Sequence, residues 1–463
     1  MKTTAKYESD RLGTQPVGRL LFLLTMPSIL GMLAITIFNI ADTIFVGRGV
    51  GTLALAGVSV SLPFIMTVTN FGMAIGIGGS SIISRALGSG DNERAELVLN
   101  NIFKLIILTN IAVIVLAAIF LDPLLILFGA NPEILPYART YSGISLIGAF
   151  FMNIINVNMN TIRAEGNVKF VMWIQTFSAI LNIILDPIFI FVFKWGVAGA
   201  AIATVISQAL GGIIAIWYYY HYPKRVLQFK AWSFMQPLNK AIVKETVAIG
   251  ASSFARHVSN SVMNIALFHA LYIHSGSAAI AAFGIVFRLL MFTYMPIFGI
   301  NQGFMPIVGY NFGAGNLIRV IKAIRLANIS ATVFAVVSMF AMLIWSRELI
   351  AIFTTDFELI ELGNFALKIV VLAFPVLGMQ IVGSGLYQAL GKAKESFFLA
   401  IVRQIVFLIP LVLILPIYFG LVGIWASFPI SDFLASVITI FMVIYQVKFL
   451  KKMNFAKPTS IAG

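Results

Sequence analysis

The chain has 463 residues, of which 60% are hydrophobic and only 10% are Asp, Glu, Lys or Arg. An average soluble domain carries about 25% charged residues, so this composition excludes a soluble enzyme as well as a disordered or fibrous chain. The formal charge of +14 does not indicate a nucleic-acid partner, because the basic residues fall in short segments between apolar runs, as they do in cytoplasmic loops of membrane proteins.

Apolar stretches long enough to cross about 30 Å of hydrocarbon as helices recur along the whole chain. The polar head before the first of them, MKTTAKYESDRLGTQ, has no small-residue cleavage site after a short apolar run, so we expect a cytoplasmic N-terminus and no removable signal peptide. An even number of spans then places the C-terminus in the cytoplasm as well. The sequence predicts an all-α, multi-pass protein of the cell (inner) membrane with twelve spans, at 17–46, 53–83, 96–121, 134–161, 168–193, 196–220, 243–272, 278–310, 320–345, 358–388, 396–419 and 422–447.

The distribution of basic residues supports this topology. Of the 31 Lys and Arg residues, 24 fall on the side of the N-terminus, 4 fall on the opposite side, and 3 (Arg256, Arg288 and Lys368) fall within spans. Cytoplasmic loops are enriched in Lys and Arg, so a missed or invented span would have scrambled this asymmetry.

The strongest organisational signal is an internal repeat of about half the chain. Residues scattered over the first half recur in the second at an offset of 225, which becomes 224 near the end of each half. The matched glycine pairs are Gly51 and Gly276, Gly90 and Gly315, Gly166 and Gly391, and, at the offset of 224, Gly196 and Gly420. Because each half holds six spans, we expect two six-helix lobes, 1–220 and 241–463, with a cytosolic linker at 221–240. The lobes should be related by a pseudo-two-fold axis along the membrane normal, with a cleft between them.

The acidic residues well inside predicted spans are Asp42, Asp186 and, closer to a span end, Asp432. A carboxylate at mid-span costs about 2.5–3.5 kcal/mol of insertion free energy, so such residues are rare and usually line a water-filled cavity. The alternative is an Asp that caps a broken helix or pairs with a neighbouring Arg or Lys. The sequence favours this alternative for Asp432 and a cavity for the other two.

The residues around Asp186 indicate a binding site. Asn182 lies four residues earlier, on the same helix face, and Pro187 follows directly and bends the span, because it lacks a backbone N–H. Thr204 lies in the next span, in a run of small residues that permits close helix approach. Together with Asp42 these side chains form an all-oxygen set, which suits Na⁺ or a proton; no Cys or His lies nearby to favour a transition metal.

Asn39, one turn before Asp42, is a candidate to complete this set of oxygen ligands. The set is predicted in the first lobe only. The second-half positions that correspond to the acids are apolar, for example Leu267. We therefore expect the first lobe to bind the coupling ion and the second to supply packing and cavity wall.

Side chains that contact a substrate are less well defined by the sequence. Adaptable cavity walls favour Met and Phe, although most such residues face lipid or fill helix contacts. The apolar candidates are Phe38, Met66, Met152 and Met263. The polar candidates are Asn39 and, in the second lobe, where interhelical hydrogen bonding is the alternative, Asn260, Asn264, Tyr294, Gln302 and Gln380.

These features resemble the multidrug and toxic compound extrusion (MATE) transporters over essentially the whole chain. The residues that carry the resemblance are Pro27 and Asp42 in PSILGMLAITIFNIADTIFVGR, the RAEGN turn at 163–167, and the set Asn182, Asp186, Ala200 and Thr204. The resemblance implies that Asp42 and the polar members of this set bind Na⁺ or H⁺, with a carbonyl from Ala200, and that Pro27 lets the first helix bend when occupancy changes. Mid-span acids are missing from the seventh and tenth spans, so the pattern is closer to the branch that couples through the first lobe alone.

We therefore expect a secondary active antiporter that exports amphipathic, often cationic drugs, dyes or metabolites in exchange for H⁺ or Na⁺, without a cofactor and without enzymatic activity. The sequence contains no HExxH, GxSxG or Walker-type motif, which disfavours a membrane enzyme and ATP-driven transport. A channel is a further alternative. A flippase of lipid-linked precursors, distantly related in fold, is favoured if Arg256 and Arg288 face the cleft. We expect a monomer whose partners, apart from its substrates, are membrane lipids and not nucleic acid.

Overall fold

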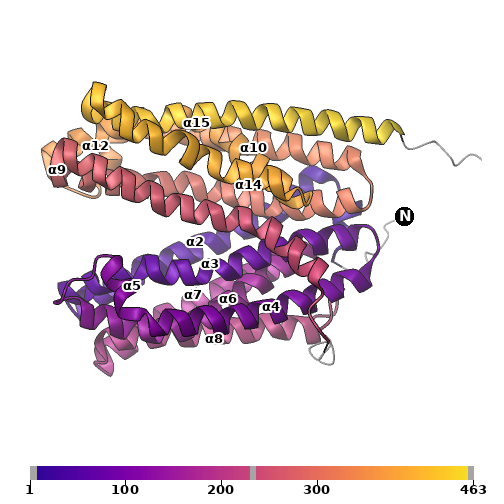
Figure 1. Cartoon of the computed structure of the whole chain (residues 1–463), viewed down its shortest axis with the longest axis horizontal. Coiled ribbons are helices and arrows are strands. Elements are labelled where there is room, and N and C mark those ends of the chain that lie inside the picture. Colours follow the sequence, from indigo (N-terminus) through magenta and orange to yellow (C-terminus); the bar gives the residue numbers. More distant parts are fainter. Residues whose placement is uncertain (1–7, 230–235, 457–463) are drawn as a thin grey trace, which may run out of the picture. The chain divides into compact units, whose positions relative to one another are not determined.

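A computed structural model of the chain describes residues 8–229 and 236–456. The predicted cytoplasmic ends of the chain, and residues 230–235 of the predicted linker, lie outside the described residues. Within the described part the chain is helical, and the elements in chain order (Figure 1) are α1 (Asp10–Thr14), α2 (Val17–Gly49), α3 (Thr52–Gly88), α4 (Asn92–Ile119), α5 (Leu121–Leu127), α6 (Leu135–Ala164), α7 (Val168–Pro187), the π-helical segment η1 (Ile188–Val192), α8 (Gly196–His221), α9 (Lys240–Gly313), α10 (Leu317–Ile344), α11 (Ser346–Ala351), α12 (Phe357–Val370), the 3₁₀ segment η3 (Val371–Ala373), α13 (Phe374–Ala389), α14 (Ala393–Ile401), the π-helical segment η4 (Val402–Leu408) and α15 (Ile409–Ala456).

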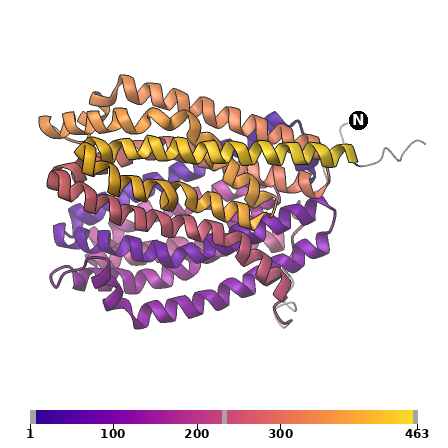
Figure 2. The same cartoon turned by 45° about the horizontal axis from the view of Figure 1, so that its top comes forward.

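Ten helical segments of the described chain are long and apolar enough to cross a membrane. One of them, Ala393–Met453, leaves helical geometry at Gly420, and Figures 1 and 2 show the yellow second half of α15 running antiparallel to the orange half before it. Helix α9 is interrupted in the same way at Ser275 and Gly276. The division at Gly420 makes two spans of that segment. The first half of α9 is helical where the span 243–272 is predicted, but it is not among these ten segments.

The repeat predicted from the sequence is visible in the backbone. Positive φ is readily available only to glycine, so a glycine with this geometry marks a specific turn. Gly51, Gly90, Gly166 and Gly196 have φ of 106°, 79°, 90° and 57°, and their counterparts Gly276, Gly315, Gly391 and Gly420 have φ of 61°, 69°, 74° and 54°. The same turns therefore recur at the same places in both halves.

Several of these turns end in a side chain that caps the next helix. Asp91 accepts a hydrogen bond from the backbone N–H of Arg94 at 2.9 Å at the start of α4. Asn167 and Asn316 begin α7 and α10 in the same manner. A helix starts with backbone N–H groups that have no partner within the helix, and the caps satisfy one of them in each case.

The chain divides into two compact units. Unit 1 comprises residues 1–14 and 27–254, and unit 2 comprises residues 15–26 and 255–463. The chain passes from one unit to the other inside α2, between Met26 and Pro27, and inside α9, between Phe254 and Ala255. The lobe boundaries at 220 and 241 stay a prediction.

Buried amides hold α3, α4 and α6 together in unit 1. Asn153 of α6 accepts from the N–H of Gly72 at 2.9 Å and donates to the carbonyl of Val68 at 3.2 Å, both on α3. It also donates to Asn110 Oδ1 of α4 at 2.7 Å. A Cβ on Gly72 would lie 2.6 Å from Asn153 Cα, so the glycine is required for this approach. The network fixes α6, one of the helices that line the candidate site, against α3 and α4.

Candidate cation and substrate site

Two carboxyl groups meet inside unit 1. Asp42 lies on α2 and Asp186 lies near the end of α7, and both side chains are buried. The carboxyl groups are within hydrogen-bonding range of each other. Asp42 Oδ1 has no hydrogen-bond partner within the described residues. Two negative charges this close repel each other strongly in a low-dielectric interior, so a proton or another cation is needed to keep the pair together.

Asn182 connects this pair to the neighbouring helix α8. With its amide nitrogen turned toward Asp186, Asn182 donates to Asp186 Oδ2 at 2.7 Å and its oxygen accepts from Thr204 Oγ1 at 3.1 Å. The same oxygen accepts from the backbone N–H of Thr204 at 3.2 Å. The reversed amide would set its nitrogen against this N–H and its oxygen against the carboxylate, so the orientation with the nitrogen toward Asp186 is the one that satisfies both ends of Asn182.

The other residues proposed for the cation set lie close by. Ala200 is buried one turn before Thr204 on α8 and packs in an apolar cluster with Val46 of α2 and Tyr141 of α6. Tyr141 lies close enough to Asp42 and Asp186 to interact electrostatically with both carboxyls. Sequence reasoning missed this tyrosine, because the hydropathy of a span does not say which of its aromatic residues faces a charge.

Pro187 marks a change of helical geometry beside the carboxyls. Helix α7 ends at this proline, and residues Ile188–Val192 continue as a π-helix, closed by a hydrogen bond from the N–H of Phe193 to the carbonyl of Ile188 at 2.9 Å. A proline removes the N–H that would otherwise close the preceding turn, and π-segments are frequent at functional sites. The predicted disturbance of this span is therefore present next to Asp186.

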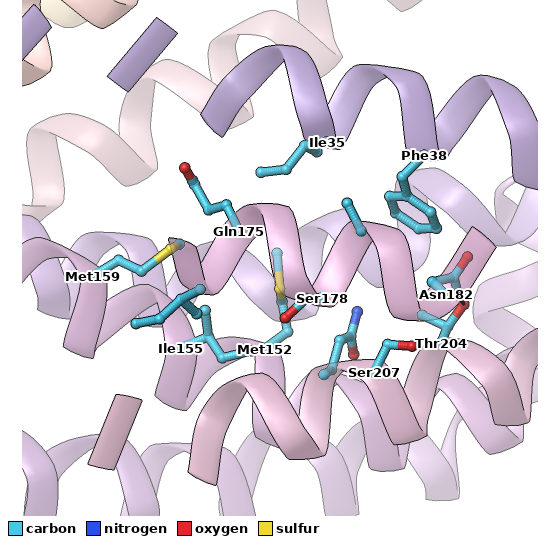
Figure 3. Close-up of a pocket in the computed structure, with 13 residues that line it drawn as sticks. Ile35, Phe38, Met152, Ile155, Met159, Gln175, Ser178, Asn182, Thr204 and Ser207 are labelled. Carbon is cyan, nitrogen blue, oxygen red and sulfur yellow. Dashed lines mark hydrogen bonds between the residues drawn. The ribbon is translucent and has the colours of Figure 1, made fainter. Parts of the chain in front are cut away.

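A cavity of about 510 Å³, including its open part, lies beside Asn182 and Thr204 in unit 1. Figure 3 shows these two residues at one end of the cavity and Ile155 and Met159 at the other. The lining comes from α2, α6, α7 and α8 and consists of Ile35, Phe38, Met152, Ile155, Met159, Ile174, Gln175, Ser178, Ala179, Asn182, Thr204, Ser207 and Gln208. A mostly apolar lining with a few polar groups is typical of sites for small organic molecules.

Two polar side chains of the cavity wall lie against glycines. Gln175 Oε1 and Ser178 Oγ are buried and have no hydrogen-bond partner in the part of the chain that the structure describes. A Cβ on Gly31 of α2 would lie 2.0 Å from Gln175 Oε1, and one on Gly211 of α8 would lie 2.3 Å from Ser178 Oγ. The two glycines therefore leave the room that these side chains of the cavity wall need.

Of the substrate-contact candidates predicted from the sequence, Phe38 and Met152 line this cavity. Asn39 and Met66 do not line it, and both are exposed. Gln380, in unit 2, donates to the carbonyl of Asp432 at 2.5 Å and to Ser436 Oγ at 2.8 Å, which is the interhelical alternative considered for it. The other candidates in unit 2 are Asn260, Met263, Asn264, Tyr294 and Gln302.

Another buried carboxyl of unit 1, that of Glu165, lies in the turn between α6 and α7, outside the spans. Its oxygens accept from the N–H groups of Val226 and Leu227 at 2.8 and 2.6 Å and from the Tyr218 hydroxyl at 2.6 Å. Burial raises the pKa of Glu165 to about 7, although these hydrogen bonds and the charge of Arg225 oppose the shift. The RAEGN turn thus ties the chain after α8 to the end of α6.

In unit 2 the buried acid has a basic partner. Asp432 of α15 pairs with the Nε of Arg403 in η4. Arg403 also donates to the Tyr294 hydroxyl at 3.1 Å. The ion-paired alternative that the sequence favours for Asp432 is therefore the arrangement in the structure.

Comparisons of the sequence and of the structure with known proteins both find transporters of one family. The family described as MatE matches residues 27–188 and 252–414, and the starts of the two matches lie 225 residues apart, which confirms the repeat. The chain is 30% identical over 422 residues to the multidrug export protein MepA of Staphylococcus haemolyticus, covering 90% of this chain and 91% of that protein. It is 27% identical over 438 residues to the FAD transporter of Shewanella oneidensis, covering 92% of this chain and 95% of that protein.

One solved structure is described as the outward-facing conformation of a multidrug resistance MATE family transporter of the MOP superfamily. It matches with a TM-score of 0.89 at 25% identity and covers 98% of this chain and 100% of that chain. This likeness confirms the predicted all-α membrane fold of twelve spans in two lobes.

Proposed function

This chain belongs to the MatE family of membrane transporters and is not an enzyme, and we propose that it exports amphipathic, often cationic organic compounds in exchange for Na⁺ or H⁺. The observation that supports this most strongly is that a candidate cation site and a candidate substrate cavity lie side by side in unit 1. The buried pair Asp42 and Asp186 takes the cation, and Asn182 joins this pair to a cavity suited to an organic molecule. The similarity to a multidrug export protein supports the class of substrate.

The carboxyl pair binds one cation at a time. A single proton shared by Asp42 and Asp186 removes the repulsion between them, as in other pairs of carboxyls that share a site. Na⁺ does the same by coordination, and the oxygens of Asn182 and Thr204 complete a set of ligands of the kind that hard cations prefer. Ala200 supplies a carbonyl in the sodium-loaded form.

Asn182 transmits the occupancy of the pair to the cavity. When Asp186 is ionised, the amide of Asn182 donates to it and presents its oxygen to Thr204. When Asp186 is protonated or coordinates Na⁺, this charge-assisted hydrogen bond is weaker, and Asn182 is held less firmly at the end of the cavity. The affinity of the cavity for substrate then differs between the two states, and this difference allows a cation to drive substrate release.

Two prolines accommodate the change of state. Pro27 is the residue at which α2 enters unit 1, and a proline inside a helix lacks the hydrogen bond that would resist bending there. Pro187 acts at the other carboxyl, where α7 gives way to a π-helix. Bending at either point moves Asp42 or Asp186 and so separates or joins the pair.

The cation that drives transport binds in unit 1 alone, and the protein belongs to the branch of the family that couples through its first lobe. Asp432, the carboxylate buried near the spans of unit 2, is neutralised by Arg403 and is not free to exchange a cation. The flippase alternative needs several basic residues around one cavity, but Arg288 is exposed and Arg403 is paired with Asp432, which leaves Arg256 alone.

The protein lies in the inner membrane as a monomer with both termini in the cytoplasm. The excess of basic residues on the side of the N-terminus supports this orientation. Its exposed apolar side chains contact membrane lipid, and nucleic acid is not a partner.

The test is dye export from proteoliposomes that carry either a Na⁺ gradient alone or a pH gradient alone. One of the gradients should drive a cationic dye against its own concentration gradient, and Asp42→Asn should reduce this movement to that of empty vesicles. Movement against the gradient at the wild-type rate in Asp42→Asn would refute the role of the pair.

A further inference from the structure

The spanning part of unit 2 holds two basic residues in its interior for one acid. Asp432 is fully engaged: its carboxylate pairs with Arg403, and its backbone carbonyl accepts from Gln380. Arg256 of α9 is the second basic residue, and it lies close enough to Arg403 for the two positive charges to repel each other. One positive charge is therefore left without a counter-charge in this cluster.

The Arg256 side chain has a neutral partner. Its Nη2 donates to Ser384 Oγ of α13 at 2.5 Å, and no carboxylate within residues 8–229 and 236–456 forms an ion pair with it. The nearby amides of Asn260 and Gln404 are bonded to each other. A guanidinium has five N–H donors in a planar fork, so most of the binding capacity of the partly exposed Arg256 is unused.

The internal repeat places this cluster at the positions that correspond to the cavity of unit 1. At the offset of 225, the cavity residues Ile35, Ile155, Met159 and Ser178 correspond to Asn260, Gln380, Ser384 and Arg403, and at the offset of 224 Gln208 corresponds to Asp432. Gly31, which lies against Gln175 in the cavity wall, corresponds to Arg256. Where unit 1 has an apolar wall that leads to two acids, unit 2 has polar side chains and a surplus cation.

A surplus cation within a span is costly unless an anion reaches it, and such residues usually contact substrates or ions. We propose that Arg256, held in place by Ser384, is an anion subsite that binds the carboxylate of a zwitterionic amphipathic substrate. The planar fork matches a carboxylate in geometry and charge. This inference rests on the proposed function, because it assigns the substrates of that exporter a subclass that carries an acid group besides its cationic and apolar parts.

The test uses a xanthylium dye in two forms, the free carboxylate and its methyl ester, which differ only at the acid group. Binding to purified protein in detergent is followed by fluorescence anisotropy. Arg256→Gln should raise the Kd of the carboxylate form by about tenfold or more, since a charge-assisted contact is lost, and should leave the Kd of the ester within about twofold. Arg288→Gln is the matched control on the same helix: Arg288 is exposed, and both dyes should bind as to the wild type.

Equal weakening of both dyes by Arg256→Gln, or weakening of neither, would overturn the subsite. If this variant does not fold, Arg256→Lys keeps the charge without the fork and should weaken the carboxylate form alone; unchanged binding of that form would count against the proposal. Ser384→Ala should keep the preference for the carboxylate form, because the guanidinium remains.

Two further arms separate this inference from its alternatives. Benzoate should compete with the carboxylate dye in the wild type and not in Arg256→Gln. If Arg256→Gln lost benzoate binding but kept full affinity for the carboxylate dye, the site would serve free anions and the substrate proposal would be wrong. Failure of proteoliposomes to export either dye would contradict the proposed function, whereas the binding measurement would still decide the subsite.

Discussion

In unit 1 two buried carboxyl groups face each other, whereas in unit 2 the buried carboxylate of Asp432 faces the guanidinium of Arg403. The backbone turns of the two halves recur at an offset of 225 or 224, so the scaffold is shared and the difference lies in the side chains. An acid that faces a base is neutralised permanently. An acid that faces another acid is neutralised only while a cation is bound, which makes unit 1 the half that responds to ion gradients.

The largest effect is expected from Asp186→Asn. An amide in place of this carboxyl removes the repulsion within the pair and with it the need for a cation, so gradient-driven dye export should fall by about a hundredfold or more, to the level of empty vesicles. Export should be measured in proteoliposomes under the gradient that drives the wild type. Retention of gradient-driven accumulation would contradict the assignment of coupling to unit 1.

Asp432→Asn should act on stability instead of coupling. It leaves Arg403 buried without its counter-charge, and removing one partner of a buried ion pair costs about 3–5 kcal/mol. The variant should show a lower midpoint of thermal unfolding in detergent, while any folded fraction keeps its dependence on the ion gradient. The double variant Arg403→Met/Asp432→Leu should recover most of the stability. Loss of coupling in a folded Asp432→Asn protein would remove the contrast between the units.

Glu165 offers a third kind of buried acid, in unit 1 but paired with neither acid nor base. Folding raises its pKa from 4.5 to about 7, so the folded state binds the proton more tightly than the unfolded state. Its protonation therefore stabilises the fold fully below about pH 4.5, and this contribution, on the order of 3 kcal/mol, is lost as the pH rises through about 7.

Glu165→Gln keeps the shape of this side chain without its titration. The unfolding midpoint of the wild type should fall relative to that of the variant between pH 5 and pH 8. Parallel curves for the two proteins over this range would show that burial does not control Glu165.

The smallest of these effects is expected from Gly31→Ala, which tests the cavity of unit 1. The added Cβ would lie 2.0 Å from Gln175 Oε1 and push this side chain into the cavity. Dye affinity should fall by about tenfold, or about 1.4 kcal/mol. Gly284→Ala is the control, since nothing lies within 4 Å of the position of its Cβ. Equal dye binding by both variants would mean that the cavity does not receive the dye.

Much of the fold could be predicted from the sequence, because hydrocarbon imposes simple requirements on a chain. Each span needs a long apolar run. A reversal between two spans is marked by a glycine with positive φ at corresponding places in the two halves, such as Gly51 and Gly276. The convergence of Asn182, Asp186 and Thr204 was also predictable, since the first two share a helix face and the third lies among small residues on the next helix.

The walls of the cavity were harder to predict. In a span every side chain is set against an apolar background, so hydropathy does not distinguish Gln175 and Ser178, which line the cavity, from Asn39, which is exposed. The pairing of Arg403 with Asp432 depends on contact between η4 and α15, which neither spacing nor composition specifies. Arg256 and Gly31 occupy corresponding positions at the offset of 225, which a position-by-position alignment of the two halves shows.

Coupling in this protein depends on Asp42 and Asp186 sharing a single cation. The direct measurement is the number of cations, protons or Na⁺, that purified protein binds per chain, in the wild type and in each single Asp→Asn variant. We predict one cation per chain in the wild type and its loss in both Asp42→Asn and Asp186→Asn. Two cations in the wild type, with one retained in each variant, would show that the carboxyls bind independently and would contradict the account.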